Sequence, residues 1–349
     1  MKILVTGGAG FIGSAVVRRA IADGHQVVNV DALTYSANLE NVASVAGSAA
    51  YAFEKADICD AAAIQAIFAR HRPDAVMHLA AESHNDRAIE DPISFVHTNV
   101  IGTAVLLEAA RAYWNGLEPA AKAAFRFHHV STDEVFGALG ETGEFSETTP
   151  YDPKSPYSAS KASADHLARA WANTYKMPVV LTNCSNNYGP YQFPEKLIPT
   201  VISRALEGKS IPVYGQGLQV RDWLHVDDHA EALLLVLAKG ALGETYCIGG
   251  DATQRNIEVV KAICAHLDRF APANTPHADK IAFVTDRPGH DFRYAIDATK
   301  LREELGWSPR IQLEQGLEET VRWYVENSDW VEGIRERGFH SERLGLVKA

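Results

Sequence analysis

Short apolar runs alternate with amphipathic stretches over the first half of the chain. Runs at 3–5, 26–31, 50–56, 75–79, 125–130 and 179–182 have the length and the composition of buried strands. The stretches at 14–22, 61–71, 92–115 and 157–175 have the spacing of helices. Strands and helices that alternate at these lengths predict an α/β fold with a doubly wound parallel sheet of the Rossmann type.

The pattern changes after residue 185. Glycine and proline cluster between 189 and 217, and the apolar segments become shorter and less regular. We expect a Rossmann-type domain over 1–185 and a smaller domain over 186–349 that covers the carboxyl edge of the sheet. The run 244–248 has the character of another strand, so segments near 221–250 are expected to rejoin the first domain.

A glycine-rich loop follows the first predicted strand. It reads TGGAGFIG and places Gly7, Gly10 and Gly13 three residues apart. Glycine suits a backbone that approaches a pyrophosphate closely and points a helix N-terminus at it. Asp31 closes the second strand, where a carboxylate can accept hydrogen bonds from both ribose hydroxyls. No Arg or Lys follows at 32–34 to neutralise a 2′-phosphate, so NAD is favoured over NADP.

Two further stretches carry groups that move protons. Asp133 and Glu134 stand where the fifth strand should end, and Tyr157 and Lys161 share one helical face at i and i+4. A Lys charge at about 4 Å is worth roughly 1–4 kcal/mol, which would lower a phenol pKa near 10 by about 1–3 units. We therefore predict that Tyr157 is a base near neutral pH. Alone, the Tyr-Lys spacing more often marks a surface helix, and paired acids as often begin a short helix.

Composition and charge restrict the kinds of partner. A net charge of −11 argues against a nucleic-acid polymer or an anionic membrane. No run approaches 18 uninterrupted apolar residues, and the first residues enter a strand directly, so neither a membrane span nor a signal peptide is expected. The 14 histidines are treated as ordinary side chains, so no metal is expected. The scattered cysteines favour a cytoplasmic protein; they are Cys59, Cys184, Cys247 and Cys264.

With these features in view, the chain resembles the extended short-chain dehydrogenase/reductases, and within them the dTDP-glucose 4,6-dehydratases. The resemblance runs from about residue 2 to 327. It rests on TGGAGFIGS (6–14), HLAAESH (78–84), STDEVFG (131–137), SPYSASKASADHL (155–167), TNCSNNYGPYQFPEKLIP (182–199), RDWLHVDDHAEAL (221–233) and DRPGHDFRYAID (286–297). The pair Asp133-Glu134 separates this family from the related 4-epimerases, which have small residues at that point.

The resemblance implies a lyase that uses NAD and takes dTDP-glucose as substrate. Tyr157 would take the proton of the 4-hydroxyl during oxidation at carbon 4, with Thr132 bonded to the same oxygen. Glu134 would remove the hydrogen of carbon 5 and a protonated Asp133 would assist the loss of the 6-hydroxyl, before hydride returns to carbon 6. A 4-epimerase, a dehydratase for UDP- or CDP-sugars, and a non-catalytic NAD-binding sensor are the alternatives.

The resemblance also implies contact residues by matching position. For the cofactor they are Gly7, Gly10, Phe11, Ile12, Gly13, Asp31, Ala32, Leu33, Thr34, Asp57, Ile58, Leu79, Ala80, Ala81, Glu82, Ser83, Thr98, Tyr157, Lys161 and Asn187. For the nucleotide sugar they are Ser83, His84, Arg87, Thr132, Asn186, Lys196, Leu197, Pro212, Val213, Tyr214, Arg221, Asn256, Asp286, Arg287, Pro288, Gly289 and His290. Arg221 and Arg287 would pair with the diphosphate, and Tyr214 would offer a face to the base.

Four residues depart from the family pattern. Phe136 and His225 stand where Tyr is usual, Asn85 where Val is usual, and Cys247 where Asn is usual. None of them is a residue to which the resemblance assigns chemistry. The helices at 92–115 and 157–175 carry Ala and Leu on more than one face, so we expect a homodimer with a four-helix contact. A monomer that buries these faces against its own sheet is the alternative.

Overall fold

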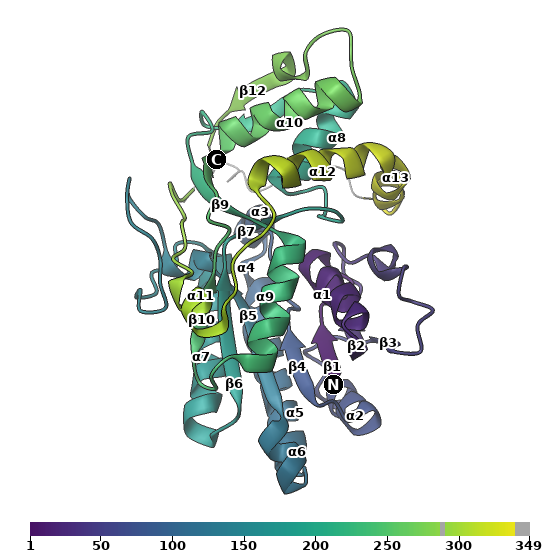
Figure 1. Ribbon diagram of the computed structural model, residues 1–349, viewed down its shortest axis with the longest axis vertical. Helices are drawn as coiled ribbons and strands as arrows, with labels where there is room; N and C mark the ends of the chain where they lie inside the picture. The colour runs from purple at the N-terminus through teal and green to yellow at the C-terminus, as the bar shows by residue number, and fades with distance from the viewer. Residues whose placement is uncertain (287–289, 339–349) are drawn as a thin grey trace.

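The computed structural model describes residues 1–286 and 290–338, and a seven-stranded sheet runs through it (Figure 1). The strand order is β10-β6-β5-β4-β1-β2-β3, and every pair in it is parallel. The strands are β1 (Lys2–Thr6), β2 (Gln26–Asp31), β3 (Tyr51–Lys55), β4 (Ala75–His78), β5 (Arg126–Thr132), β6 (Val179–Cys184) and β10 (Thr245–Ile248). The predicted Rossmann-type sheet is confirmed, and the strand expected at 244–248 joins it.

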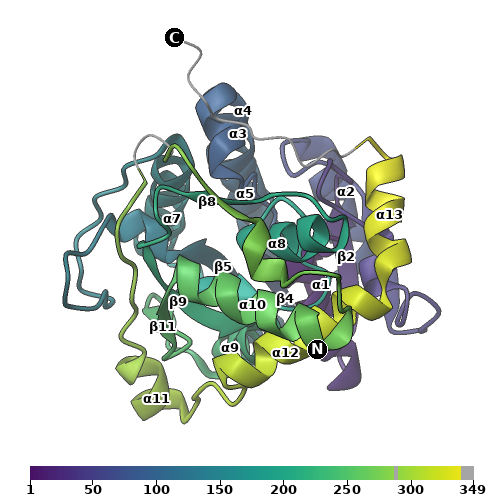
Figure 2. The same cartoon turned by 90° about the horizontal axis from the view of Figure 1, so that it is seen from above.

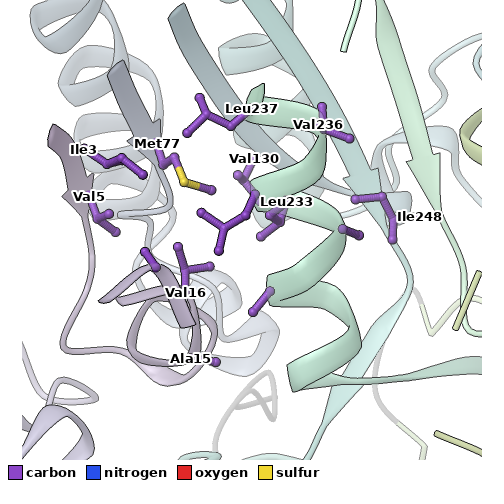
Figure 3. Close-up of a cluster of buried hydrophobic side chains, with 14 of the residues drawn as sticks. Ile3, Val5, Ala15, Val16, Met77, Val130, Leu233, Val236, Leu237 and Ile248 are labelled. Carbon is purple, nitrogen blue, oxygen red and sulfur yellow. The ribbon is translucent and has the colours of Figure 1, made fainter. Parts of the chain in front are cut away.

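Helices cover both faces of this sheet. On one face α1 (Phe11–Ala22) and α9 (Val226–Lys239) bury a core against β1, β4 and β5, in which Leu233 lies among the side chains shown in Figure 3. On the other face lie α2 (Ala61–His71), α5 (Thr103–Asn115) and α7 (Pro156–Tyr175). The doubly wound arrangement follows from strands that are apolar on both sides.

The helix predicted at 92–115 is continuous but not uniform. It begins as α4 (Pro92–Phe95), passes through a π-helical stretch, η2 (Val96–Gly102), and continues as α5. Among the described residues, this is the helical run whose length and apolar composition would suffice to cross a membrane, a test that core helices also pass. Here Leu106 and Leu107 are fully buried against the sheet, so the run behaves as a core helix.

A second group of elements lies beyond the carboxyl edge of the sheet (Figures 1 and 2). A separate hydrophobic core joins α8 (Leu197–Leu206), α10 (Asn256–Phe270), α12 (Leu313–Glu326) and α13 (Ser328–Glu336). Two small sheets complete it, one of β8 (Ile211–Tyr214) with β12 (Ile281–Val284) and one of β11 (Thr253–Arg255), β9 (Val220–His225) and β7 (Asn186–Tyr188). The remaining elements are η1 (Leu39–Val42), α3 (Asn85–Glu90), α6 (Pro119–Ala124), η3 (Asp133–Phe136), η4 (His277–Lys280) and α11 (Thr299–Leu305). The domain boundary at residue 185 stays a prediction.

Strand β5 extends further than its apolar run. The run ends at Val130, but the pairing with β6 continues through Ser131 opposite Asn183 and Thr132 opposite Cys184. Because these polar residues keep the strand geometry, the paired acids begin immediately at the edge of the sheet.

We predict that Leu233→Ala lowers the free energy of unfolding by about 2–5 kcal/mol, because it opens a cavity in a fully packed core. Urea unfolding followed by circular dichroism measures the change. Leu242→Ala is the control, since Leu242 is 47% exposed, and should change stability by less than about 0.5 kcal/mol. Equal losses in the two variants would contradict the assignment of Leu233 to the core.

Candidate active site

A cavity of about 310 Å³ opens at the carboxyl ends of the parallel strands. It is lined by residues that follow β1, β2, β3, β4, β5 and β6, together with residues of α1 and α7. In open parallel sheets, ligands bind at this edge where neighbouring connections run in opposite directions. The topology therefore gathers segments that are far apart in the sequence around one space.

The glycine loop is packed so tightly that its backbone lies open to the cavity. A Cβ on Gly13 would lie 2.0 Å from the Gly7 carbonyl oxygen, and Gly7 itself has a φ of +74°. Helix α1 begins at Phe11, and no side chain caps its N-terminus at Gly10. The first N–H groups of a helix need partners from outside it, so the loop fits an anionic pyrophosphate.

Asp31 is buried at the end of β2 and lines the cavity. Its carboxylate accepts hydrogen bonds from the backbone N–H groups of Ala9 (3.0 Å) and Leu33 (2.8 Å). Burial raises the pKa of Asp31. Because a carboxylate has about four lone-pair sites, Asp31 retains capacity for ribose hydroxyls. The fit to a dinucleotide thus extends from the loop to β2.

All five residues predicted for the chemistry line this same cavity. Thr132 ends β5 and caps η3, where its hydroxyl oxygen accepts from the Glu134 N–H at 3.3 Å. Its hydroxyl also donates to Asp133 Oδ1 at 3.3 Å. The structure therefore brings Thr132, Asp133 and Glu134 from one element together with Tyr157 and Lys161 from another.

The two neighbouring carboxyl groups have different surroundings. Asp133 is 1% exposed, whereas Glu134 is half-buried and accepts a hydrogen bond from Asn85 Nδ2 at 3.0 Å. Burial, and next the charge of Glu134, raise the pKa of Asp133 well above 3.8, against the opposing charge of Arg221. The buried Asp133 Oδ2 has no hydrogen-bond partner among the described residues. Burial thus favours the protonated form of Asp133.

The predicted effect of Lys161 on Tyr157 is wrong for the protein alone. Burial, followed by the charge of Glu134, raises the pKa of Tyr157 well above 10.0. Lys161 Nζ donates to the Val130 carbonyl oxygen at 2.9 Å, and burial lowers its own pKa. The buried Lys161 ammonium group does not offset the two effects that raise the pKa of Tyr157, which are the lost hydration of its phenolate and the negative charge of Glu134.

The predicted cofactor residues lie together. All of them line the cavity except Leu33, which lines a neighbouring cavity with Thr34. Leu33 has a φ of 55°, and its backbone N–H is turned toward Asp31. The grouping supports the prediction but leaves the contacts with a cofactor as a prediction.

The predicted substrate residues divide into two groups. Ser83, Thr132, Asn186 and Lys196 line the cavity, and Lys196 Nζ donates to the Ser83 carbonyl oxygen at 2.8 Å. The others do not line it; they are His84, Arg87, Leu197, Pro212, Val213, Tyr214, Arg221, Asn256, Asp286 and His290. Three further residues, Arg287, Pro288 and Gly289, lie outside the described residues.

Part of the second group forms its own cluster. The Tyr214 hydroxyl donates to Asp86 Oδ2 at 3.0 Å, and the ring of His290 lies edge-on to Tyr214 at 6.1 Å. His290 Nδ1 lies 2.6 Å from Asp286 Oδ1. Val213, by contrast, is 2% exposed within the second hydrophobic core, so its side chain is not available to a ligand.

Arg221 is buried rather than presented at a surface. It donates to the Asp291 carbonyl oxygen at 2.9 Å, and its guanidinium lies 4.2 Å from the centre of the Tyr294 ring. The positive charge of Arg221 lowers the pKa of Asp133, against the larger effect of burial. These contacts place Arg221 near the acid pair, and its predicted pairing with a diphosphate stays a prediction.

Several residues of the site were not singled out in the sequence. Gln192, Phe193 and Glu195 line the cavity, and Glu195 accepts a hydrogen bond from the Tyr35 hydroxyl at 3.0 Å. They lie in the stretch 182–199 that carries the resemblance, but it is rich in glycine and proline and has no periodicity to single them out. Asp165 is different: it stands one helical turn after Lys161, and that spacing could have indicated it.

The fold and the site together define a class of protein. A Rossmann-type sheet with an open glycine loop and a Tyr-Lys pair at its carboxyl edge is the arrangement of the short-chain dehydrogenase/reductases. A family model described as GDP-mannose 4,6 dehydratase matches residues 4–320. A dTDP-glucose 4,6-dehydratase of Xanthomonas campestris pv. campestris (strain B100) is 59% identical over 346 residues, which cover 99% of each chain.

Solved structures agree with these sequence comparisons. A dTDP-glucose 4,6-dehydratase of Bacillus anthracis in complex with NAD has a TM-score of 0.85 and 46% identity, and covers 96% of this chain and 99% of its own. One from Streptomyces venezuelae with NAD bound has a TM-score of 0.87 and 42% identity, and covers 96% of this chain and 100% of its own. The chain belongs to the dTDP-glucose 4,6-dehydratase family.

We predict that Asp133→Asn stabilises the protein increasingly as the pH rises. The folded-state pKa of Asp133 is raised, so the wild-type protein loses stability as the pH rises from 3.8 toward that folded value. The neutral amide removes this loss, which amounts to at most about 1.4 kcal/mol for each pH unit. Urea unfolding at pH 5 and pH 8, roughly either side of neutrality, measures the difference. A constant difference between the two proteins would contradict the raised pKa.

Proposed function

We propose that the chain catalyses the NAD-dependent dehydration of dTDP-glucose to dTDP-4-keto-6-deoxyglucose. The observation that carries the proposal is the unequal acid pair: Asp133 is buried with a raised pKa, and the half-buried Glu134 lies beside it in the same cavity as Tyr157. A 4-epimerase needs only a group that removes and returns the proton of one hydroxyl. The elimination of water needs in addition an acid and a base that act at different atoms.

The glycine loop and Asp31 would hold NAD. The backbone N–H groups at the start of α1 would bind its pyrophosphate, and the Asp31 carboxylate would accept from its ribose hydroxyls. When bound, NAD would supply a hydride acceptor for carbon 4, a hydride donor for carbon 6, and a positive charge on its nicotinamide ring.

Tyr157 and Thr132 would hold the 4-hydroxyl of the sugar. Both side chains line the same cavity, which supports contact of both with a single oxygen. Because the pKa of Tyr157 is raised in the protein alone, its action as a base depends on positive charge that arrives with the ligands. Lys161, fixed by the Val130 carbonyl group, orients the helical turn that carries Tyr157.

Asp133 and Glu134 would carry out the elimination. Glu134 would remove the hydrogen of carbon 5, which a ketone at carbon 4 makes acidic. Asp133 would donate its proton to the departing 6-hydroxyl, and its unpartnered Oδ2 is the atom placed to do so. A desolvated carboxyl with a raised pKa is suited to this role.

The same proposal includes a homodimer in the cytoplasm. Apolar side chains are exposed along α4 and η2, with Ile93 at 73%, Val96 at 45% and Ile101 at 48%, and Tyr175 at the end of α7 is 43% exposed. Such a stripe on the helices flanking the sheet supports a contact between two copies. All four cysteines are free, which supports a reducing compartment.

We predict that the protein converts dTDP-glucose in heavy water to a product that has lost one water and carries deuterium at carbon 5. Proton NMR and mass spectrometry follow the nucleotide sugar. Asp133→Asn combined with Glu134→Gln should lower this rate by about 100-fold or more. Retained turnover in the double variant, with an unchanged mass and a galactose-type product, would replace the proposal by a 4-epimerase. Turnover of UDP- or CDP-glucose in place of dTDP-glucose would change the substrate and keep the reaction.

A separate prediction concerns the cofactor. Gly13→Ala should raise the dissociation constant for NAD about tenfold, because a Cβ at 2.0 Å from the Gly7 oxygen forces the loop to move and such overpacking costs about 1–3 kcal/mol. Isothermal titration calorimetry measures it. Gly47→Ala is the control, since nothing lies within 4 Å of its Cβ position and its φ is not positive, and it should leave the NAD affinity unchanged. Unchanged affinity in Gly13→Ala would place the dinucleotide elsewhere.

A further inference from the structure

Asn85 contacts the acid pair, although it is one of the residues that depart from the family pattern. It is the first residue of α3, and it is half-buried. Its Nδ2 donates to Glu134 Oε2 at 3.0 Å, and its Oδ1 accepts from the Ser155 hydroxyl at 3.1 Å. Both ends of the amide are therefore used, and their directions are fixed because Ser155 supplies the donor to one end and the carboxylate accepts from the other.

The bond to Ser155 connects Asn85 to the helix of the catalytic tyrosine. Ser155 is the N-cap of α7, and its hydroxyl oxygen accepts from the Ser158 N–H at 3.0 Å in a capping box. Tyr157 lies in the first turn of that helix. A chain of hydrogen bonds thus runs from Glu134 on η3 through Asn85 on α3 to the start of α7, so the base and the tyrosine share one support.

We propose that Asn85 is a positioning residue for Glu134, holding its carboxylate at the place from which the hydrogen of carbon 5 is removed. The proposal rests on the proposed dehydration for the identity of that step. A glutamate side chain has three rotatable bonds, and proton abstraction requires it to lie within hydrogen-bond reach of its target. A donor on one carboxylate oxygen fixes the side chain before the substrate arrives, and errors of about 1 Å in such groups cost rate strongly.

The Asn85 amide is an uncharged donor to Glu134 among groups that can ionise. Among the described residues, the charge of Glu134 raises the pKa of Asp133 on η3, Tyr157 on α7, Cys184 on β6 and Tyr294 after β12. Asp133 repels the carboxylate when both are ionised, and the others are neutral hydroxyl or thiol groups at ordinary pH. Asn85 supplies a hydrogen-bond donor from a third element, which holds Glu134 without adding a charge.

Asn85→Asp tests the proposal with a side chain of the same size. The carboxylate can still accept from the Ser155 hydroxyl, but it cannot donate to Glu134 and places like charges face to face. We expect kcat to fall about tenfold with KM unchanged, as the loss of a hydrogen bond to a charged group predicts. The kinetic isotope effect with substrate deuterated at carbon 5 should increase, while that at carbon 4 should not. Asn85→Val, which removes the donor without a charge, should show the same isotope pattern with a smaller loss.

Asn115→Asp is the matched control. Asn115 ends α5, outside the cavity lining, and its Oδ1 accepts from Lys122 Nζ at 3.2 Å. Its kcat and isotope effects should equal those of the wild type. Wild-type isotope effects in both Asn85 variants, or a fall in kcat with no change in the carbon 5 effect, would overturn the proposal. Absence of deuterium at carbon 5 in the wild-type product would instead overturn the proposed function.

Discussion

One buried carboxylate holds the site together. Asp165, fully buried on α7, accepts hydrogen bonds from Ser131 (2.9 Å), Tyr151 (2.8 Å) and Asn183 (3.3 Å), and lies 3.0 Å from His129 Nε2. Burial alone would raise its pKa, but these partners outweigh burial and the pKa is lowered. A buried charge is tolerated only when it is paired and hydrogen-bonded. Asp165 therefore fixes the helix that carries Tyr157 to β5, β6 and the preceding loop. Loss of any one of these hydrogen bonds would leave a buried charge less well compensated.

Burial in the same low-dielectric environment shifts the pKa values of Asp133 and Tyr157 in the same direction, which has opposite consequences for the roles proposed for the two side chains. Both pKa values are raised by burial and by the charge of Glu134. A raised pKa favours the acid role proposed for Asp133, because the acid must keep its proton until the 6-hydroxyl departs. It opposes the base role proposed for Tyr157, because a base must be deprotonated before it can accept a proton. In the protein alone, both raised pKa values favour the protonated side chains. Under the proposed function, the positive charge of the nicotinamide ring would favour deprotonation of Tyr157.

Sequence patterns correctly predicted the features that depend on residues close together in the chain. The alternation of strands and helices, the glycine loop and the acid pair all depend on neighbours in sequence, and the structure places them as expected. The direction of the Tyr157 pKa, the burial of Val213 in the second core, and the partners of Asp165 depend on residues far along the chain. The extension of β5 through Ser131 and Thr132 was missed for the same reason, since their hydrogen bonds come from β6 and α7 rather than from apolar burial.

The geometry of a 3₁₀ turn explains how the adjacent carboxyl groups of Asp133 and Glu134 come to lie in different surroundings. With 3.0 residues per turn, consecutive side chains point about 120° apart. On η3 this directs Asp133 into the interior, where it is 1% exposed, and leaves Glu134 half-buried beside Asn85. In an extended strand the two would point to opposite faces of the sheet, and one of them would leave the cavity. The Thr132 hydroxyl that caps the turn therefore starts the conformation that separates the two carboxyl groups.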